Sequence, residues 1–216
     1  MAVLLLVVVG IGLWIYISYE RNKNKSKQWL EFEDANTVAK LEEIAKKDPN
    51  LAVGRVAEMS VARSLLGPEG IDQLNATTQE NRQKAIDNVE KAREMFTKLL
   101  SQFDKDPVFK AECLLGLAKA EAALIAVPVK PTDLTDYRGK MTKLVEYLDQ
   151  LAATAAPDTP WATDSKKLAD ALRNEKAQTA SDFVRIQRSL TNTTPILPKF
   201  DDPHAPGGPL PIGPKK

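Results

Sequence analysis

The sequence predicts an all-α protein with a single transmembrane helix at its amino-terminal end, followed by a degenerate solenoid of helical hairpins. Three observations predict this fold class. Residues 3–19 form an unbroken apolar run without charge or proline. Apolar residues then recur at three- and four-residue spacing in one segment after another, as they do on one face of a helix. Proline-containing turns separate these segments, and the residue before a proline is pushed out of the helical region.

Residues 1–19 are expected to form a transmembrane anchor. At a rise of about 1.5 Å per residue, the run VLLLVVVGIGLWIYISY is just long enough to cross a hydrocarbon core of about 30 Å. Its far end is rich in aromatic residues, whose amphipathic rings prefer the headgroup layer. The residues expected to anchor the chain in lipid are Val3, Leu4, Leu5, Leu6, Trp14, Tyr16 and Tyr19.

A cleavable signal peptide is the alternative interpretation of this run. Signal peptides carry positive charge before a core of about 7–15 apolar residues, and small residues at the cleavage site. Here no Lys or Arg precedes the run, and bulky aromatic residues occupy its end, so an anchor fits better. By the positive-inside rule, the basic flank Arg21–Lys27 places the remainder of the chain in the cytoplasm. A basic segment upstream would weaken or reverse that argument, so the orientation of the anchor stays open.

The next segments are expected to be helical. Residues 20–50 form a juxtamembrane helical stalk that ends at Asp48-Pro49, and residues 51–190 form the helical domain. Residues 108–126 form the most apolar helix of the domain, which we expect to be buried between two neighbours. Cys113 lies in this helix and is expected to be a small core residue. The predicted helices of the domain are 51–66, 79–103, 108–126, 133–156 and 161–190, the last with a polar middle at 173–180 that is exposed or bent.

Residues 191–216 are expected to be a proline-rich disordered or extended tail. They contain seven prolines and three glycines and few groups that build a core. The only histidine, His204, lies in this tail, where a solvated role is expected.

Composition and motifs exclude several function classes. The net charge is +1, with 30 basic and 29 acidic residues, which argues against nucleic acid as a partner. The single cysteine forms no intrachain disulfide. There is no phosphate-binding glycine loop, no metal-ligand cluster and no nucleophile motif. We therefore expect no enzymatic activity, cofactor, metal or small-molecule substrate.

Several residues resemble the tetratricopeptide spacing. The second helix of that repeat has a small residue, an aromatic residue four positions later, an aliphatic residue three later and a proline at the turn. Ala92, Phe96, Leu99 and Pro107 follow this order, and Leu115-Gly116 resembles the Leu-Gly pair of the first helix. The small residues allow two helices to approach closely, and the aromatic residue fills the space between repeats.

The whole layout resembles the bacterial membrane-anchored tetratricopeptide-like family, whose members include the ancillary subunit of the Sec translocon. The segments KAREMFTKLLSQFDKDPVFKAECLLGLAKAEAAL and LDQLAATAAPDTPWATDSKKLADAL carry this resemblance. It implies a single-pass protein of the bacterial inner membrane, with an extracytoplasmic helical domain that contacts envelope proteins, including chaperones. That placement is opposite to the one from the charge rule, and we follow the resemblance.

These observations favour a membrane-tethered protein–protein interaction module associated with the export machinery or envelope chaperones. Its partners would be other proteins, such as Sec translocon subunits or chaperones, together with membrane lipid around the anchor. The candidate groove residues are Arg55, Glu58, Arg63 and Lys119; solvated charges on the convex face are the alternative for each. The second functional hypothesis is a structural subunit of a larger membrane complex, in which the helical domain is a rigid spacer.

Overall fold

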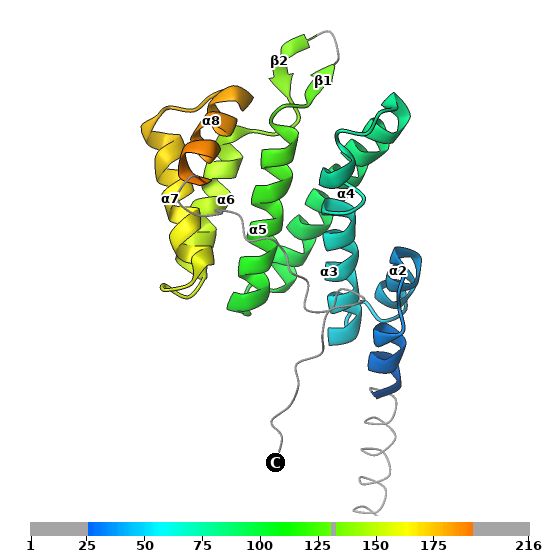
Figure 1. Ribbon diagram of the computed structural model, residues 1–216. Helices are drawn as coiled ribbons and strands as arrows, with labels where there is room; N and C mark the ends of the chain where they lie inside the picture. Colours follow the sequence, from blue (N-terminus) through cyan, green and yellow to red (C-terminus); the bar gives the residue numbers. More distant parts are fainter. Residues whose placement is uncertain (1–25, 131–132, 192–216) are drawn as a thin grey trace, which may run out of the picture.

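The computed structural model describes residues 26–130 and 133–191, which form a predominantly helical body with one short hairpin (Figure 1). A helix over residues 26–33 comes first. The elements that follow are α2 (Val38–Lys47), α3 (Ala52–Leu66), the 3₁₀ helix η1 (Ile71–Gln73), α4 (Gln79–Gln102), α5 (Pro107–Leu124), β1 (Pro128–Lys130), β2 (Asp133–Tyr137), α6 (Met141–Thr154), α7 (Pro160–Asn174) and α8 (Ala180–Thr191). The predominantly helical class predicted from the sequence is confirmed.

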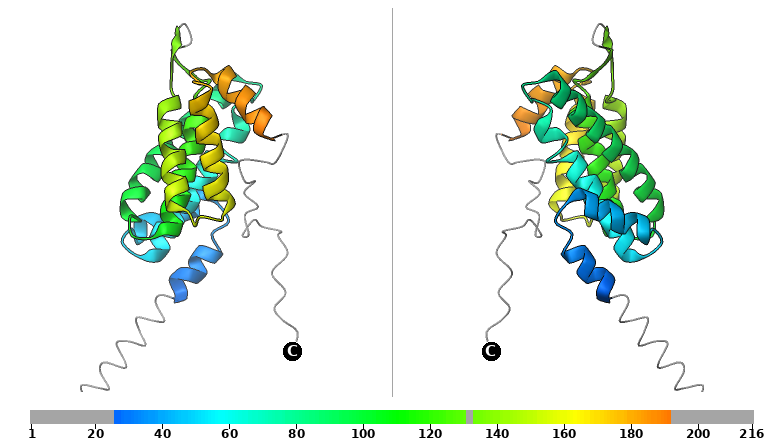
Figure 2. Two further views of the ribbon diagram at one scale, coloured as in Figure 1. Left: turned by 90° about the vertical axis from the view of Figure 1, so that its left-hand side faces the viewer. Right: turned by 90° about the vertical axis from the view of Figure 1, so that its right-hand side faces the viewer.

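The helices stand side by side in a row, and their direction alternates along the chain (Figure 1; Figure 2). Each helix from α2 to α7 packs against the next one in the sequence, and α3 also touches α5. The starts of α3 and α5 lie at the lower edge of the row in Figure 1, which is also the edge that carries residues 26–33. The antiparallel hairpin of β1 and β2 projects from the opposite edge.

Local capping signals in the sequence set where several helices begin. A Thr or Asp side chain accepts a hydrogen bond from a backbone N–H of the first turn, which would otherwise lack a partner. Pro107 and Pro160 then occupy the first turn of α5 and α7, where a missing N–H costs nothing. The capping residues are Thr37, Thr78, Asp106 and Thr159.

The central helix is α5, which has neighbours on all sides. Cys113 and Leu117 pack with α3 and α4, whereas Ala118 packs with α6, α7 and α8. Even two of its carboxylates are buried: Glu112 pairs with Arg63, and Glu121 pairs with Arg93 at 3.2 Å. The expectation that this helix is buried between neighbours, with Cys113 in the core, is confirmed.

The close approach of α4 and α5 depends on Gly116. A Cβ atom at this position would lie 2.6 Å from Cε2 of the Phe96 ring, closer than side-chain atoms normally approach. Phe96 is itself buried and fills the space between the two helices. The small-residue and aromatic positions singled out in the sequence therefore face each other across this helix pair.

The structure corrects three of the predicted helix bounds. The helix expected at 133–156 begins only at Met141, because Asp133–Tyr137 pairs with β1 as a strand. The helix expected at 161–190 is two helices, α7 and α8, separated within the polar middle segment. The expected stalk helix breaks between residues 33 and 38.

The stalk expected at residues 20–50 is part of the folded body over the residues that the structure describes. Ile44 of α2 is buried against Val53 and Ala57 of α3, and Phe32 joins this cluster from the preceding helix. Glu42 of α2 accepts a hydrogen bond from Lys91 of α4, with 2.8 Å between Nζ and Oε1. The apolar contacts form because α2 is amphipathic and its apolar stripe packs against α3.

Two of the predicted segments, the anchor at residues 1–19 and the tail after Thr191, lie outside the described residues. Within residues 26–130 and 133–191, no helix combines the length and apolar character that a membrane crossing requires.

Candidate functional site

The segment after the β1–β2 hairpin borders a groove of about 700 Å³, which we call the hairpin groove. One wall is the segment that leaves β2 and starts α6. The other wall is the end of α7 and the connection to α8. The lining residues are Tyr137, Gly139, Lys140, Met141, Thr142, Val145, Leu172, Arg173, Lys176, Ala177 and Gln178.

The first wall is held in place by the buried carboxylate of Glu121 in α5. Its Oε2 accepts a hydrogen bond from the backbone N–H of Lys140 at 2.7 Å, and its Oε1 lies 3.2 Å from Nη1 of Arg93. The same Arg93 nitrogen donates to the carbonyl oxygen of Arg138 at 3.0 Å. One charge-assisted network thus ties α4, α5 and the groove wall together.

Gly139 allows this wall to lie directly on α5. Its N–H donates to the carbonyl oxygen of Leu124 at 3.0 Å. A Cβ atom at position 139 would lie 2.3 Å from the carbonyl oxygen of Glu121. Because backbone atoms cannot move aside as a flexible side chain can, a residue with a Cβ would push the wall away from α5.

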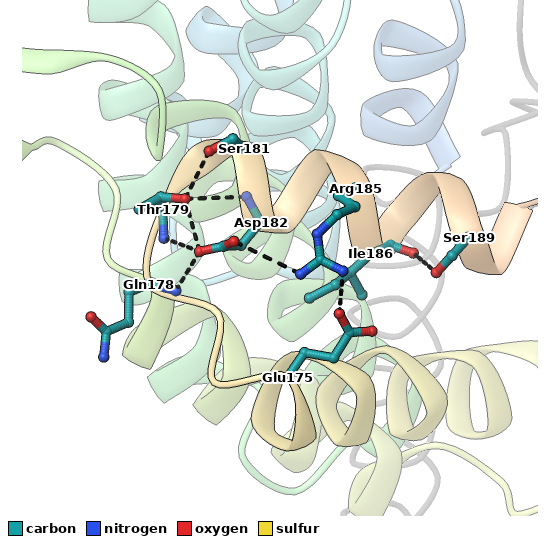
Figure 3. Close-up of polar contacts among 8 residues, drawn as sticks. All are labelled: Glu175, Gln178, Thr179, Ser181, Asp182, Arg185, Ile186 and Ser189. Carbon is teal, nitrogen blue, oxygen red and sulfur yellow. Dashed lines mark hydrogen bonds and ion pairs between the residues drawn. The ribbon is translucent and has the colours of Figure 1, made fainter.

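The second wall is the connection between α7 and α8, which a capping box stabilises (Figure 3). The Thr179 hydroxyl accepts a hydrogen bond from Asp182 N–H at 3.2 Å, and Asp182 Oδ2 accepts from Thr179 N–H at 3.1 Å. Asp182 also accepts from Gln178 N–H, and Arg185 pairs with Glu175. The hydroxyl of Thr179 and these backbone N–H groups hold the pKa of the Asp182 carboxyl below its usual value.

Lys176 sits between these walls in a left-handed backbone conformation, with φ of 50°. Such a conformation is uncommon for a residue with a side chain and is typical of the position just after a helix. It turns the chain sharply after α7, so that Ala177 N–H donates to the carbonyl oxygen of Leu172 at 3.0 Å. The turn brings Ala177 and Gln178 into the groove lining.

The groove combines an apolar interior with a charged rim. Met141, Val145 and Leu172 supply aliphatic side chains, and Leu172 belongs to the buried core below. On the rim, Lys140 pairs with Asp136 at 2.5 Å and Arg173 with Asp149 at 2.6 Å. Such a groove suits an extended or helical apolar segment with polar flanks.

Three of the predicted groove residues lie on α3, and their charged groups contact neighbouring helices. Glu58 accepts a hydrogen bond from Lys98 of α4 at 2.6 Å, and Arg63 pairs with Glu112 of α5. The Arg55 guanidinium carbon lies 5.4 Å from the centre of the Phe103 ring. Interhelical contacts therefore engage these charges.

Arg55 also borders a second, smaller hollow of about 330 Å³ at the turn between α4 and α5. The Phe103 and Phe109 rings stack there, with 4.6 Å between their centres.

The fourth predicted residue, Lys119 of α5, is partly buried. Burial lowers the pKa of Lys119 to about 8, since desolvation disfavours the ammonium form. None of Arg55, Glu58, Arg63 and Lys119 lines the hairpin groove. The residues expected for a groove therefore lie apart from the hairpin groove.

Sequence reasoning missed the residues of the hairpin groove. Lys140 and Met141 lie inside the helix expected at 133–156. Arg173 and Lys176 lie in the polar middle, 173–180, of the helix expected at 161–190. One local signal for the first wall was available, because Gly139 lies inside the helix expected there and glycine commonly marks a turn. No local signal pairs this turn with the end of α7.

Within residues 26–130 and 133–191, no cluster of three or more histidine, cysteine or acidic side chains has metal-binding geometry. Cys113 is buried, and burial raises the pKa of its thiol to about 12. This thiol is therefore protonated and shielded in the folded domain.

Comparison of the chain with protein-family models, with curated proteins and with solved structures finds no match.

Proposed function

We propose that this protein is a membrane-tethered protein–protein interaction module that captures a segment of a partner protein in the hairpin groove. The observation that carries the proposal is the groove itself: an apolar interior, a rim of charged side chains and a wall fixed by the buried Glu121. Residues 1–19 act as the transmembrane anchor in this proposal, because their apolar run has the length and aromatic border of a membrane span.

The helical body is proposed to be a degenerate tetratricopeptide-like solenoid. Three features support this assignment. Each helix packs on the next, Phe96 fits against Gly116 between consecutive helices, and α3 touches α5 through Arg63 and Glu112. In stacked hairpins, first helices of successive pairs meet in this way and leave an extended surface for a ligand. The hairpin of β1 and β2 replaces the short turn of a regular repeat.

Binding would be reversible and helped by the anchor. An apolar segment of a partner would cover Met141, Val145 and Leu172, and its polar flanks would meet Lys140 and Arg173 on the rim. Because the anchor confines the module to one membrane, its effective concentration toward a partner in the same membrane reaches roughly the millimolar range.

The resemblance of the sequence to the membrane-anchored tetratricopeptide-like family supports partners from the export machinery or envelope chaperones. It also supports an extracytoplasmic position of the domain at the bacterial inner membrane. Both points belong to this proposal.

Site-specific photocrosslinking of the full chain in bacterial membranes tests the proposal. We place a photoreactive amino acid at Thr142, an exposed groove residue, and for comparison at Lys84, an exposed residue of α4. The expected result is a discrete protein adduct at Thr142 that is at least about tenfold stronger than any adduct at Lys84. The Lys176→Glu change should weaken the Thr142 adduct by reversing one rim charge.

Equal adducts at both positions would argue against capture in the groove. A complex of fixed composition that survives detergent and crosslinks through both positions would favour the structural-subunit hypothesis. Identification of the adduct by mass spectrometry then tests the export-machinery assignment separately.

A further inference from the structure

Exposed apolar side chains gather at one end of the described body. Among the residues that the structure describes, six large apolar side chains are exposed, and four of them lie at the end that carries residues 26–33, away from the hairpin (Figure 1). Two are in that helix, one precedes α3 and one is in the first turn of α5. We call this set the basal face; its members are Trp29, Leu30, Leu51 and Val108.

Specific contacts hold the first half of the basal face, Trp29 and Leu30, against the rest of the body. Gln28 donates a hydrogen bond to Asp48 at 3.1 Å, which ties the helix of residues 26–33 to the turn before α3. Trp29 meets the Phe32 ring edge to face, at 5.9 Å between ring centres, and Phe32 packs into the cluster with Val53. The helix that carries Trp29 and Leu30 is therefore docked on the body.

The other half of the basal face, Leu51 and Val108, lies next in the chain to residues that line the smaller hollow at the turn between α4 and α5. Ala52 and Phe109 both line this hollow, and they directly follow Leu51 and Val108 in the chain. Leu51 precedes α3 and Val108 lies in the first turn of α5, and both helices start at the edge of the row that carries residues 26–33 (Figure 1; Figure 2). Val108 is 66% exposed and Leu30 is 58% exposed, so water covers much of each side chain in the isolated body.

We infer that the basal face lies in the headgroup layer of the membrane that holds the anchor, so that the domain rests on the lipid surface. The inference depends on the proposed anchor. Six residues lie between Tyr19 and Ser26. Even a fully extended chain over these seven residue steps spans only about 25 Å. The basal face consequently stays within reach of the headgroups whatever the path of this linker.

The chemistry of the basal face matches a lipid interface. Trp is enriched at the headgroup level, and aliphatic side chains gain free energy when they enter the boundary with the acyl chains. The nearby charges are of both signs: Lys27, Lys105 and Lys110 accompany Asp104 and Asp106. Attraction should therefore come mainly from apolar burial, with little requirement for anionic lipid.

Fluorescence quenching in vesicles tests this inference on the full chain. A thiol is introduced as Val108→Cys on the basal face, or as Val129→Cys on the hairpin at the opposite end, where the native valine is 40% exposed. An environment-sensitive fluorophore is attached to the thiol before the chain is reconstituted into vesicles of phosphatidylcholine that also contain a minor fraction of phosphatidylglycerol. The native Cys113 is buried, and the unsubstituted chain shows whether it stays unlabelled.

Headgroup-spin-labelled lipid should quench the probe at position 108 at least about threefold more than the probe at position 129. Iodide in the aqueous phase should show the reverse order. Circular dichroism of both labelled chains must match that of the unsubstituted chain, which both exposed sites should allow.

Two results in a chain that floats with the vesicles overturn the inference but leave the anchor in place. The first is equal quenching by lipid at both positions. The second is shielding of position 108 from both quenchers that increases with the protein density in the vesicles. The second result would assign the basal face to another copy of the chain. A chain that fails to float with vesicles instead refutes the anchor and the proposed function together with this inference.

Discussion

The helices α5 and α8 differ in apolar content and are held by different forces. α5 buries side chains all around its axis, including Leu114, Leu115 and Leu117. α8 buries Phe183 and Ile186 on one stripe, whereas Val184 on its other side is exposed. Polar contacts at its start complete its attachment (Figure 3). The comparison teaches that the core of the described body is central in the row of helices, and that α8 is attached to it as a cover.

The largest expected effect comes from placing a buried charge in each of the two helices in turn. Leu115→Asp should cost more than about 4 kcal/mol and unfold the whole domain, because an unpaired carboxylate would enter the core. Ile186→Asp should instead release α8 locally. Hydrogen exchange of the full chain measures both, and the expected result is loss of protection everywhere for Leu115→Asp but only in residues 180–191 and their contacts for Ile186→Asp.

If Leu115→Asp leaves the melting temperature nearly unchanged, α5 is not the central helix of the core. If Ile186→Asp unfolds the whole domain, α8 is an integral part of the core and the contrast between the two helices fails.

A second change tests the packing between α4 and α5. Gly116→Ala should cost about 1–2 kcal/mol, because overpacking against the Phe96 ring outweighs the roughly 1 kcal/mol that Ala gains in helix propensity. Denaturant unfolding of the full chain in detergent measures the change. Adding Phe96→Leu in the Gly116→Ala background should lose less stability than Phe96→Leu alone costs in the native background, since the ring no longer occupies the contested space. Additive costs would mean that Gly116 and Phe96 do not compete for space.

The attachment of α8 by its capping box can be tested within the same helix. Thr179→Ala should destabilise α8 by about 1 kcal/mol, because the capping hydroxyl that accepts from Asp182 N–H is lost. Ser189→Ala is the matched control, since the Ser189 hydroxyl donates to the carbonyl oxygen of Ile186 within the helix and caps nothing. Hydrogen exchange in residues 180–191 should accelerate for the first variant alone; equal acceleration in both would show that the cap contributes nothing specific.

The smallest expected effect concerns pH and Lys119 of α5. Its pKa is about 8 in the folded protein and about 10.5 when unfolded, so the unfolded state binds more protons between these pH values. The free energy of unfolding should therefore rise with pH across this window by less than about 1 kcal/mol, since Lys119 is partly exposed and solvent screens it. Unfolding titrations of the native chain and of Lys119→Met should differ by this slope, and parallel curves would contradict it.

Much of the helical layout was predictable because its signals are local. Thr78, Asp106-Pro107 and Thr159-Pro160 mark helix starts by side-chain capping and by the restricted backbone of proline, which act within one turn. The hairpin was not predictable from spacing, because Leu134, Tyr137 and Met141 fit a helical stripe although the first two belong to a strand. Strand pairing with β1 decided the outcome, and pairing is a tertiary contact.

The candidate site was less predictable than the fold for the same reason. The hairpin groove unites Lys140 with Arg173, which are far apart in sequence and meet only after α6 and α7 pack. The charges expected on a groove, Glu58 and Arg63, instead meet Lys98 and Glu112 of neighbouring helices. A sequence displays a charge but does not display the partner that folding supplies.

If the hairpin groove binds a partner as proposed, the carboxylate of Glu121 affects how tightly it does so. Because it receives hydrogen bonds from both the Arg93 guanidinium and the backbone at Lys140, the wall has its final shape before any partner arrives. A rigid receptor loses little conformational entropy on association, so more of the gross interaction energy is retained as affinity. The ordering cost of complex formation then falls almost entirely on the incoming polypeptide, and stiffening that polypeptide should be the most effective way to strengthen the complex.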